Sequence, residues 1–252
     1  MINYFMTQPG PVQVFMLLAH ALLVLAAAVG CMRWLGSRLR GRTDLIPVAP
    51  YFVSVTTVFA LFLAFHASTI WNRQHAAEAA FHNAVTAISR LNSLFGKEGQ
   101  GLENARVHLA SYTDAVVREE WSTGNTKPSP RAVQALEQVR QELISASARV
   151  PTAFGNHVWH VFDDVVKTRS TRLWIGQHDH SERSWALVLL LGFLSHIVIG
   201  LVHADRPSAG KLAMAFFACA TTACYWLLTR AIDPFAGLDA TQYLRAISGS
   251  GA

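Results

Sequence analysis

The sequence predicts an all-α integral membrane protein with four transmembrane helices in two hairpins and a helical soluble insert between helices 2 and 3. Two observations predict this fold. Of the 252 residues, 52% are apolar and only 15% are charged, whereas an average soluble domain has about 25% charged residues. In addition, four stretches contain no Asp, Glu, Lys or Arg, namely Val12–Met32, Leu45–Asn72, Ser184–Ala204 and Leu212–Thr229. Each is long enough, or nearly so, to cross a bilayer core of about 30 Å as a helix of roughly 20 residues.

The first two stretches form the predicted N-terminal membrane hairpin, residues 1–72. Val12–Met32 is longer than the apolar region of a cleaved signal, and no Lys or Arg precedes it, so we expect a retained membrane helix. An Arg-rich turn, Gly36–Arg42, is followed by Pro47 and Pro50. Proline is tolerated in the first turn of a helix, which places the start of the second membrane helix here.

Residues 73–183 form the predicted helical insert, because their apolar residues recur at helical spacing without strand-like alternation. One apolar stripe starts directly after the second membrane stretch and has no helix breaker, which predicts that this membrane helix continues into the insert: Ala77, Ala80, Ala84, Ile88, Leu91 and Phe95. Further helices are expected over residues 102–121 and 132–150 and after Pro151. Ser129 before Pro130 has the pattern of a helix cap followed by a first-position proline.

The last two stretches form the C-terminal membrane hairpin, residues 184–230, which turns at 205–210 and leaves a short C-terminal tail, 231–252. Orientation depends on the basic residues near the membrane. Arg33, Arg38, Arg40 and Arg42 lie in the connection between the first two membrane helices. Short basic loops tend to be cytoplasmic, which would put the insert on the opposite side of the membrane.

The sequence does not favour an enzyme, a cofactor, a metal site or a nucleic-acid partner. It has no phosphate-binding glycine loop after a strand, no nucleophile motif, and no basic run interleaved with aromatic residues. The eleven histidines do not form the spacings of a zinc site. His20, His66 and His196 lie within membrane stretches, where ionisable groups are costly. Each is a candidate for an ion or proton path, or for a hydrogen bond to a neighbouring helix.

Residues 59–91 carry a resemblance to a known family and read FALFLAFHASTIWNRQHAAEAAFHNAVTAISRL. This segment resembles the second membrane helix of bacterial bestrophins and the amphipathic continuation that follows it. The features that match lie in the membrane helix and at Arg73, Glu78 and Arg90. Further matches to a bestrophin-like membrane family follow in the same order along the chain: Glu120, Trp121, Arg169, Arg172, Asp233, Pro234 and Phe235.

The resemblance implies a homopentameric anion channel of the bacterial plasma (inner) membrane, whose partners are the lipid bilayer, copies of the same chain and inorganic anions. One second membrane helix from each subunit would line the pore. The implied neck positions are Thr57, Leu61 and Phe65, with His66 near the charged end of the neck. Calcium gating is not expected, because no acidic run resembles the calcium clasp of animal bestrophins.

A second hypothesis comes from a different class of protein. The chain would be a non-conducting membrane-anchored scaffold or sensor whose helical insert binds a ligand or a partner protein. The size of the insert favours this hypothesis, as do the arginines of the first connection, which put the insert outside the cytoplasm. Bestrophins, in contrast, keep their soluble part in the cytoplasm, so the sequence leaves the side of the insert open.

Overall fold

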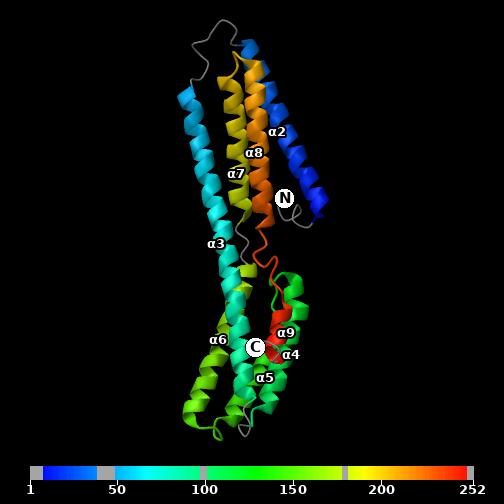
Figure 1. The fold of residues 1–252 in the computed structure, drawn as a ribbon, viewed down its shortest axis with the longest axis vertical. Coiled ribbons are helices and arrows are strands. Elements are labelled where there is room, and N and C mark those ends of the chain that lie inside the picture. Colours follow the sequence, from blue (N-terminus) through cyan, green and yellow to red (C-terminus); the bar gives the residue numbers. More distant parts are fainter. Residues whose placement is uncertain (1–7, 39–48, 97–100, 178–180, 249–252) are drawn as a thin grey trace. The chain divides into compact units, whose positions relative to one another are not determined.

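The computed structural model describes residues 8–38, 49–96, 101–177 and 181–248, and within these ranges the chain is helical and has no strand. Figure 1 shows the helices, whose bounds are α2 (Gly10–Arg38), α3 (Ala49–Phe95), α4 (Glu103–Ala115), α5 (Pro130–Ala146), α6 (Thr152–Gln177), α7 (Ser181–Val202), α8 (Pro207–Arg230) and α9 (Thr241–Ser248). A π turn, Val116–Glu120, and a 3-10 turn, Trp121–Thr123, follow α4. The predicted all-α fold is confirmed.

Four helices have the length and composition of membrane spans, as predicted: Gly10–Arg38, Pro50–Phe95, Arg183–Val202 and Pro207–Arg230. The chain divides into two compact units. Residues 1–71 and 180–232 form what we call the membrane unit, and residues 72–179 and 233–252 form the insert unit. The segment after the last span thus belongs to the same unit as the insert.

In the membrane unit, α7 and α8 lie between α2 and α3 (Figure 1). Small residues allow α7 to approach its neighbours closely. A Cβ atom added to Gly200 of α7 would lie 3.3 Å from the Ala28 carbonyl oxygen of α2. One added to Gly192 would lie 2.3 Å from the Tyr225 hydroxyl of α8. Membrane helices commonly pack through small residues in this way. Arg40 and Arg42, in the connection between α2 and α3, lie outside the described residues.

On the other side of α7 and α8, α3 contributes Phe59, Ala67 and Ile70 to an apolar cluster. The partners of these residues in α7 and α8 are Trp185, Val188, Tyr225 and Leu228. One face of the membrane part of α3 is therefore packed against the rest of the membrane unit. The face that it leaves uncovered is described below.

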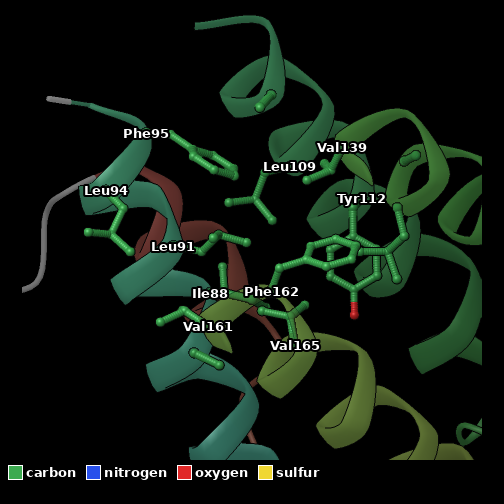
Figure 2. Close-up of a cluster of buried hydrophobic side chains, with 14 of the residues drawn as sticks. Ile88, Leu91, Leu94, Phe95, Leu109, Tyr112, Val139, Val161, Phe162 and Val165 are labelled. Carbon is green, nitrogen blue, oxygen red and sulfur yellow. The ribbon is translucent and has the colours of Figure 1, made fainter. Parts of the chain in front are cut away.

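The insert unit is organised around the continuation of α3. This helix runs without interruption to Phe95, which confirms the prediction that the second membrane helix extends into the insert. The predicted stripe is buried: Ile88 and Leu91 are fully buried, and they meet Leu109 of α4, Val139 of α5 and Phe162 of α6 in one core (Figure 2). Ser129 caps α5 as predicted, because its hydroxyl accepts a hydrogen bond from the N–H of Ala132 at 3.1 Å.

The C-terminal segment also packs on this core, through the short helix α9. Tyr243 of α9 is fully buried, and its ring lies 5.4 Å from the ring of Phe81 of α3. Asn92 Nδ2 of α3 donates to the carbonyls of Ala246 and Ile247, at 3.2 and 2.8 Å. These carbonyls lie at the end of α9, where intrahelical partners are missing. Residues 241–248 are thus an integral part of the insert unit.

Candidate functional site

The membrane part of α3 has an uncovered face that includes the residues expected to line a pore. Leu61 and Phe65 expose 52% and 62% of their surfaces, and Thr57 is also exposed. Phe59 and Ala67, on the packed face, expose only 3% and 9%. Positions four apart along a helix share a face, so Thr57, Leu61 and Phe65 form a continuous stripe that no other part of the described chain covers.

Three hydroxyl groups on this part of α3 are satisfied within the helix itself. The side chains of Ser54, Thr56 and Thr69 each donate to the carbonyl four residues earlier, at 2.9 to 3.1 Å. Such bonds remove the cost of placing a hydroxyl in an apolar surrounding. The uncovered face is therefore mostly apolar, with polar groups that tolerate either lipid or water.

The structure separates His66 from the other three expected pore positions. Successive residues of a helix point about 100° apart, and the His66 ring is turned into the membrane unit, where it is 6% exposed. It packs edge to face against Trp185 of α7, with the ring centroids 4.7 Å apart. Its Nε2 atom is buried and has no hydrogen-bond partner in the described chain. Within this chain, His66 therefore lies behind the uncovered stripe.

The other two membrane histidines also lie inside the membrane unit or at its helix contacts. The His196 ring is buried, with Nδ1 2.8 Å from the Gly192 carbonyl oxygen of the same helix. The His20 ring lies 6.4 Å from the ring of Tyr225. For His196 the contact is thus a hydrogen bond within α7.

A buried ion cluster in the insert unit brings together residues far apart in the sequence. Glu120, at the end of the π turn, and Arg172, in α6, are both fully buried. Arg172 Nη2 donates to Glu120 Oε2. Arg169 Nε donates to Glu120 Oε1 at 3.1 Å, and the Ser129 N–H donates to the same oxygen at 3.0 Å. One carboxylate therefore holds α6 and the start of α5 together.

The loop before α5 completes the cluster. Arg172 Nη1 donates to Asn125 Oδ1. Asn125 and Gly124 both have positive φ, 59° and 63°, in the left-handed region that Gly and Asn tolerate best. The loop passes very close to α6 at Gly176, because a Cβ there would lie 2.3 Å from the Asn125 carbonyl oxygen. Gly176 therefore allows the close approach that brings Asn125 to Arg172.

Aromatic rings enclose the Arg172 guanidinium. Its Cζ atom lies 5.8 Å from the ring centroid of Trp121 and 5.7 Å from that of Tyr243, within the range of cation–π attraction. Burial alone would lower the pKa of Arg172, but interactions with Tyr243, Tyr112 and Glu120 outweigh it, and this pKa is raised. Burial raises the pKa of Tyr243 to about 12 and also raises that of Tyr112. Arg172 therefore stays charged and the two tyrosines neutral at physiological pH.

The remaining family-matching residues have separate positions in the insert unit. Arg73 Nη2 donates to the Ile175 carbonyl oxygen at 2.8 Å, and Glu78 Oε2 lies 3.5 Å from His75 Nδ1. Arg90 is exposed and lines a groove between α3 and α6. Of these residues, Arg73 joins α3 to the end of α6.

Asp233, Pro234 and Phe235 form the turn that begins the C-terminal segment of the insert unit. Asp233 Oδ1 accepts a hydrogen bond from the Phe235 N–H at 3.0 Å. Pro234 is buried, and the Phe235 ring lies 5.6 Å from that of Trp121, next to the ion cluster. The three residues therefore anchor the segment that leads to α9.

The ion cluster is closed and its charged groups bind one another, so its chemistry is that of a structural clamp. Two of its members were not identified in the sequence, Asn125 and Tyr243. Asn125 follows Gly124 in a polar loop, which is typical of a turn. Tyr243 lies in a segment expected to be a tail. No local pattern indicated that either residue reaches Arg172.

Comparisons with known proteins agree with this fold. A family model described as "Bestrophin-like domain" matches residues 18–242. Two crystal structures of mutants of a bacterial bestrophin homologue from Klebsiella pneumoniae are similar to the chain. One has a TM-score of 0.70 at 12% identity and covers 94% of this chain and 99% of that chain. The other has a TM-score of 0.71 at 11% identity and covers 96% of each.

A third crystal structure, described as a membrane protein, has a TM-score of 0.70 at 12% identity and covers 94% of this chain and 99% of that chain. No curated protein matches the sequence at a significant level. The structural likeness concerns the fold. The family match extends over most of the sequence and includes the insert and the last three candidate spans. The chain therefore belongs to the bestrophin-like family of integral membrane proteins.

Proposed function

We propose that the chain is the subunit of a bestrophin-like, anion-conducting channel of the bacterial inner membrane, in which α3 from each of five subunits lines a central pore. The observation that carries the proposal is the uncovered stripe of Thr57, Leu61 and Phe65, whose helix is packed on the opposite face. A pore needs such a helix, with one face held by its own subunit and the other free. An apolar ring at the neck can control conduction by dewetting.

Family membership supports the choice of a channel over an enzyme. The positions of the stripe support the choice of α3 as the lining helix, because they coincide with those that the bestrophin resemblance implies for the neck. The choice of anions rests on the family resemblance, and on the positive formal net charge of the chain, +5, which favours anionic partners.

Cysteine accessibility tests the lining helix directly. We expect Thr57→Cys, Leu61→Cys and Phe65→Cys to react with water-soluble thiol reagents in the membrane-embedded protein, because their side chains would face water. The three native cysteines would first be replaced, since Cys219 and Cys224 are exposed. The measurement is the labelled fraction at each position.

Two control positions make the result specific. Leu63→Cys lies in the same helix but packs against the membrane unit, and Leu23→Cys in α2 is 70% exposed but faces lipid in the proposed assembly. Neither should react. Labelling of Leu23→Cys as fast as Phe65→Cys would mean that exposure alone explains the reactivity, and the assignment of α3 as the lining helix would fail.

Conduction and assembly have their own measurements. The purified protein should give currents in planar bilayers, with a reversal potential that follows the chloride gradient. Its mass after solubilisation should be that of about five chains of 27.7 kDa. No current under varied pH, voltage and anion would contradict conduction, and a monomer or dimer would contradict the pore.

His66 gives a further prediction about the same channel. Histidine is the side chain that changes charge between about pH 5 and 8. A positive charge beside the pore-lining stripe would attract anions, so we expect the current to rise as pH falls from about 7 to 5. His66→Ala should remove this dependence and leave assembly intact. His196→Ala, which changes a second buried membrane histidine, should keep it. An unchanged pH response in His66→Ala would make His66 a packing residue only.

The second candidate function is a scaffold or sensor, and one specific observation favours it. A groove of about 540 Å³ in the insert unit lies between α3 and α6, and its lining includes two basic residues and one acidic residue, Arg90, Lys167 and Asp164, together with Asn83 and Thr168. Its charge and size would suit a small anionic ligand. A protein that is monomeric or dimeric, gives no current, and loses ligand binding on Arg90→Gln would support this function instead.

A further inference from the structure

A long apolar groove runs along the outer side of the membrane unit, between α2 and α8. It has a volume of about 540 Å³. Its wall is apolar apart from Cys219 and Thr222. Leucines of α2 face small residues of α8 across it, which leaves the space open: Leu18, Leu22 and Leu25 opposite Ala215, Cys219 and Ala223.

The length of the groove corresponds to one leaflet of the membrane. It extends along α2 from Val14 to Leu25, and eleven residues of helix rise by about 16 Å. Half of a hydrocarbon core of about 30 Å is roughly 15 Å. A single acyl chain that enters from one membrane surface would therefore fill the groove along its whole length.

One end of the groove has a positive charge. Trp226 is the last residue of α8 that lines the groove, and the Arg230 guanidinium lies 4.2 Å from the centroid of the Trp226 ring. Arg230 Nη2 also lies only 3.5 Å from where a Cβ of Gly10 would be, so the guanidinium is next to the first turn of α2. The N-terminus of a helix carries a partial positive charge of its own. Two positive groups thus meet at this end.

The chain provides no acidic residue in this first turn to neutralise them. The first turn of α2 has no acidic residue, and the first acidic residue of the sequence is Asp44. Asp233, the acidic residue nearest to Arg230 in the sequence, accepts a hydrogen bond from the Phe235 N–H. In the first turn of α2, residue 11 is a proline and the N–H groups of Val12 and Gln13 donate to the Pro9 carbonyl oxygen, so the Arg230 guanidinium is the group that would bind a phosphate. Arg and Trp are also typical of the membrane interface, where phosphates lie.

We infer that the groove between α2 and α8 binds an anionic phospholipid, with one acyl chain between the leucines of α2 and the small residues of α8 and with the phosphate at Arg230, beside the start of α2. The apolar wall, the leaflet length and the paired positive groups each correspond to one part of such a lipid. This inference does not depend on conduction, since it concerns a surface on the opposite side of α8 and α7 from the stripe on α3.

Native mass spectrometry of the full-length protein in detergent tests the inference. Delipidated protein would be titrated with phosphatidylglycerol or phosphatidylcholine of the same acyl chains. We expect phosphatidylglycerol to bind more tightly. Arg230→Gln should weaken its binding about fivefold, because one basic residue near an anionic lipid is worth about that factor. Binding of phosphatidylcholine should change little in this variant. Arg206→Gln removes an exposed arginine at the other end of α8 and should leave both affinities unchanged.

A second pair of variants tests the acyl chain. Ala223→Leu fills the groove and should weaken the binding of both lipids. Ala220→Leu makes the same change on the same helix outside the groove and should have no effect. Equal binding of the two lipids, or no effect of Arg230→Gln, would overturn the headgroup site. If Ala223→Leu altered the mass of the assembly and not lipid binding, the groove would be a contact between copies of the chain and the inference would be wrong.

Discussion

Replacing Glu120 by Gln should destabilise the insert unit by about 3–5 kcal/mol, since it leaves buried charge without its partner. The Glu120 carboxylate accepts hydrogen bonds from Arg169 and Arg172, and Arg172 is fully buried. The pKa of Arg172 is raised, so this side chain cannot escape the cost by losing its proton. The amide of Gln has almost the same shape as the carboxylate, so the effect reports the lost charge and not a cavity.

Hydrogen exchange of the protein in detergent measures this effect within residues 101–177. Amides that exchange only when the insert unit opens should exchange faster in the variant than in the unmodified protein. Asp114→Asn is the matched control. Asp114 pairs with Arg118 and Arg131 at the surface, and surface pairs contribute about 1 kcal/mol or less.

Arg172→Met in addition to Glu120→Gln should recover part of the lost stability, because it removes the buried charge that Glu120→Gln leaves without its partner. If Glu120→Gln were as mild as Asp114→Asn, the clamp would have no role in stability.

The sequence predicts the elements that depend on local pattern. Uncharged stretches of span length predict the four membrane helices, and the apolar stripe from Ala77 to Phe95 predicts the uninterrupted α3. The cap at Ser129 also follows from a local signal, because a Ser before Pro at a helix start can accept a hydrogen bond from an N–H only three residues later in the chain. In each case the interacting residues are close together in the chain.

What the sequence does not predict depends on contacts between distant segments. Glu120 and Arg172 are 52 positions apart, and the resemblance to bestrophins indicated both residues without indicating that they pair. The segment after the last span was expected to be a tail, but the packing of Tyr243 against Phe81 makes it part of the insert unit. His66 shares a membrane stretch with Leu61 and Phe65, but its ring packs against Trp185 of α7, a residue far from it in the chain.

Gly176→Ala should lower the free energy of unfolding of the insert unit by about 3 kcal/mol or more, as much as many substitutions in a protein core. The added Cβ would lie 2.3 Å from the Asn125 carbonyl oxygen, 2.7 Å from its carbonyl carbon and 3.0 Å from the Gly124 carbonyl oxygen. All three are backbone atoms, so no side-chain rotation relieves the clash. The loop itself cannot easily move, because Gly124 and Asn125 both have positive φ and Asn125 Oδ1 accepts from Arg172.

Gly155→Ala provides the matched control in the same helix, α6. A Cβ at Gly155 would meet the nearest atom, Val150 Cγ2, at 3.4 Å, an ordinary contact with a side chain. Alanine also favours the helical state over glycine by roughly 0.5–1 kcal/mol, so this variant should be neutral or more stable. Thermal unfolding of the two variants in the full-length protein would therefore shift in opposite directions, or only Gly176→Ala would shift. If Gly176→Ala unfolded at the same temperature as Gly155→Ala, the loop would not be held against α6, and the Asn125 contact with Arg172 could not be part of the clamp.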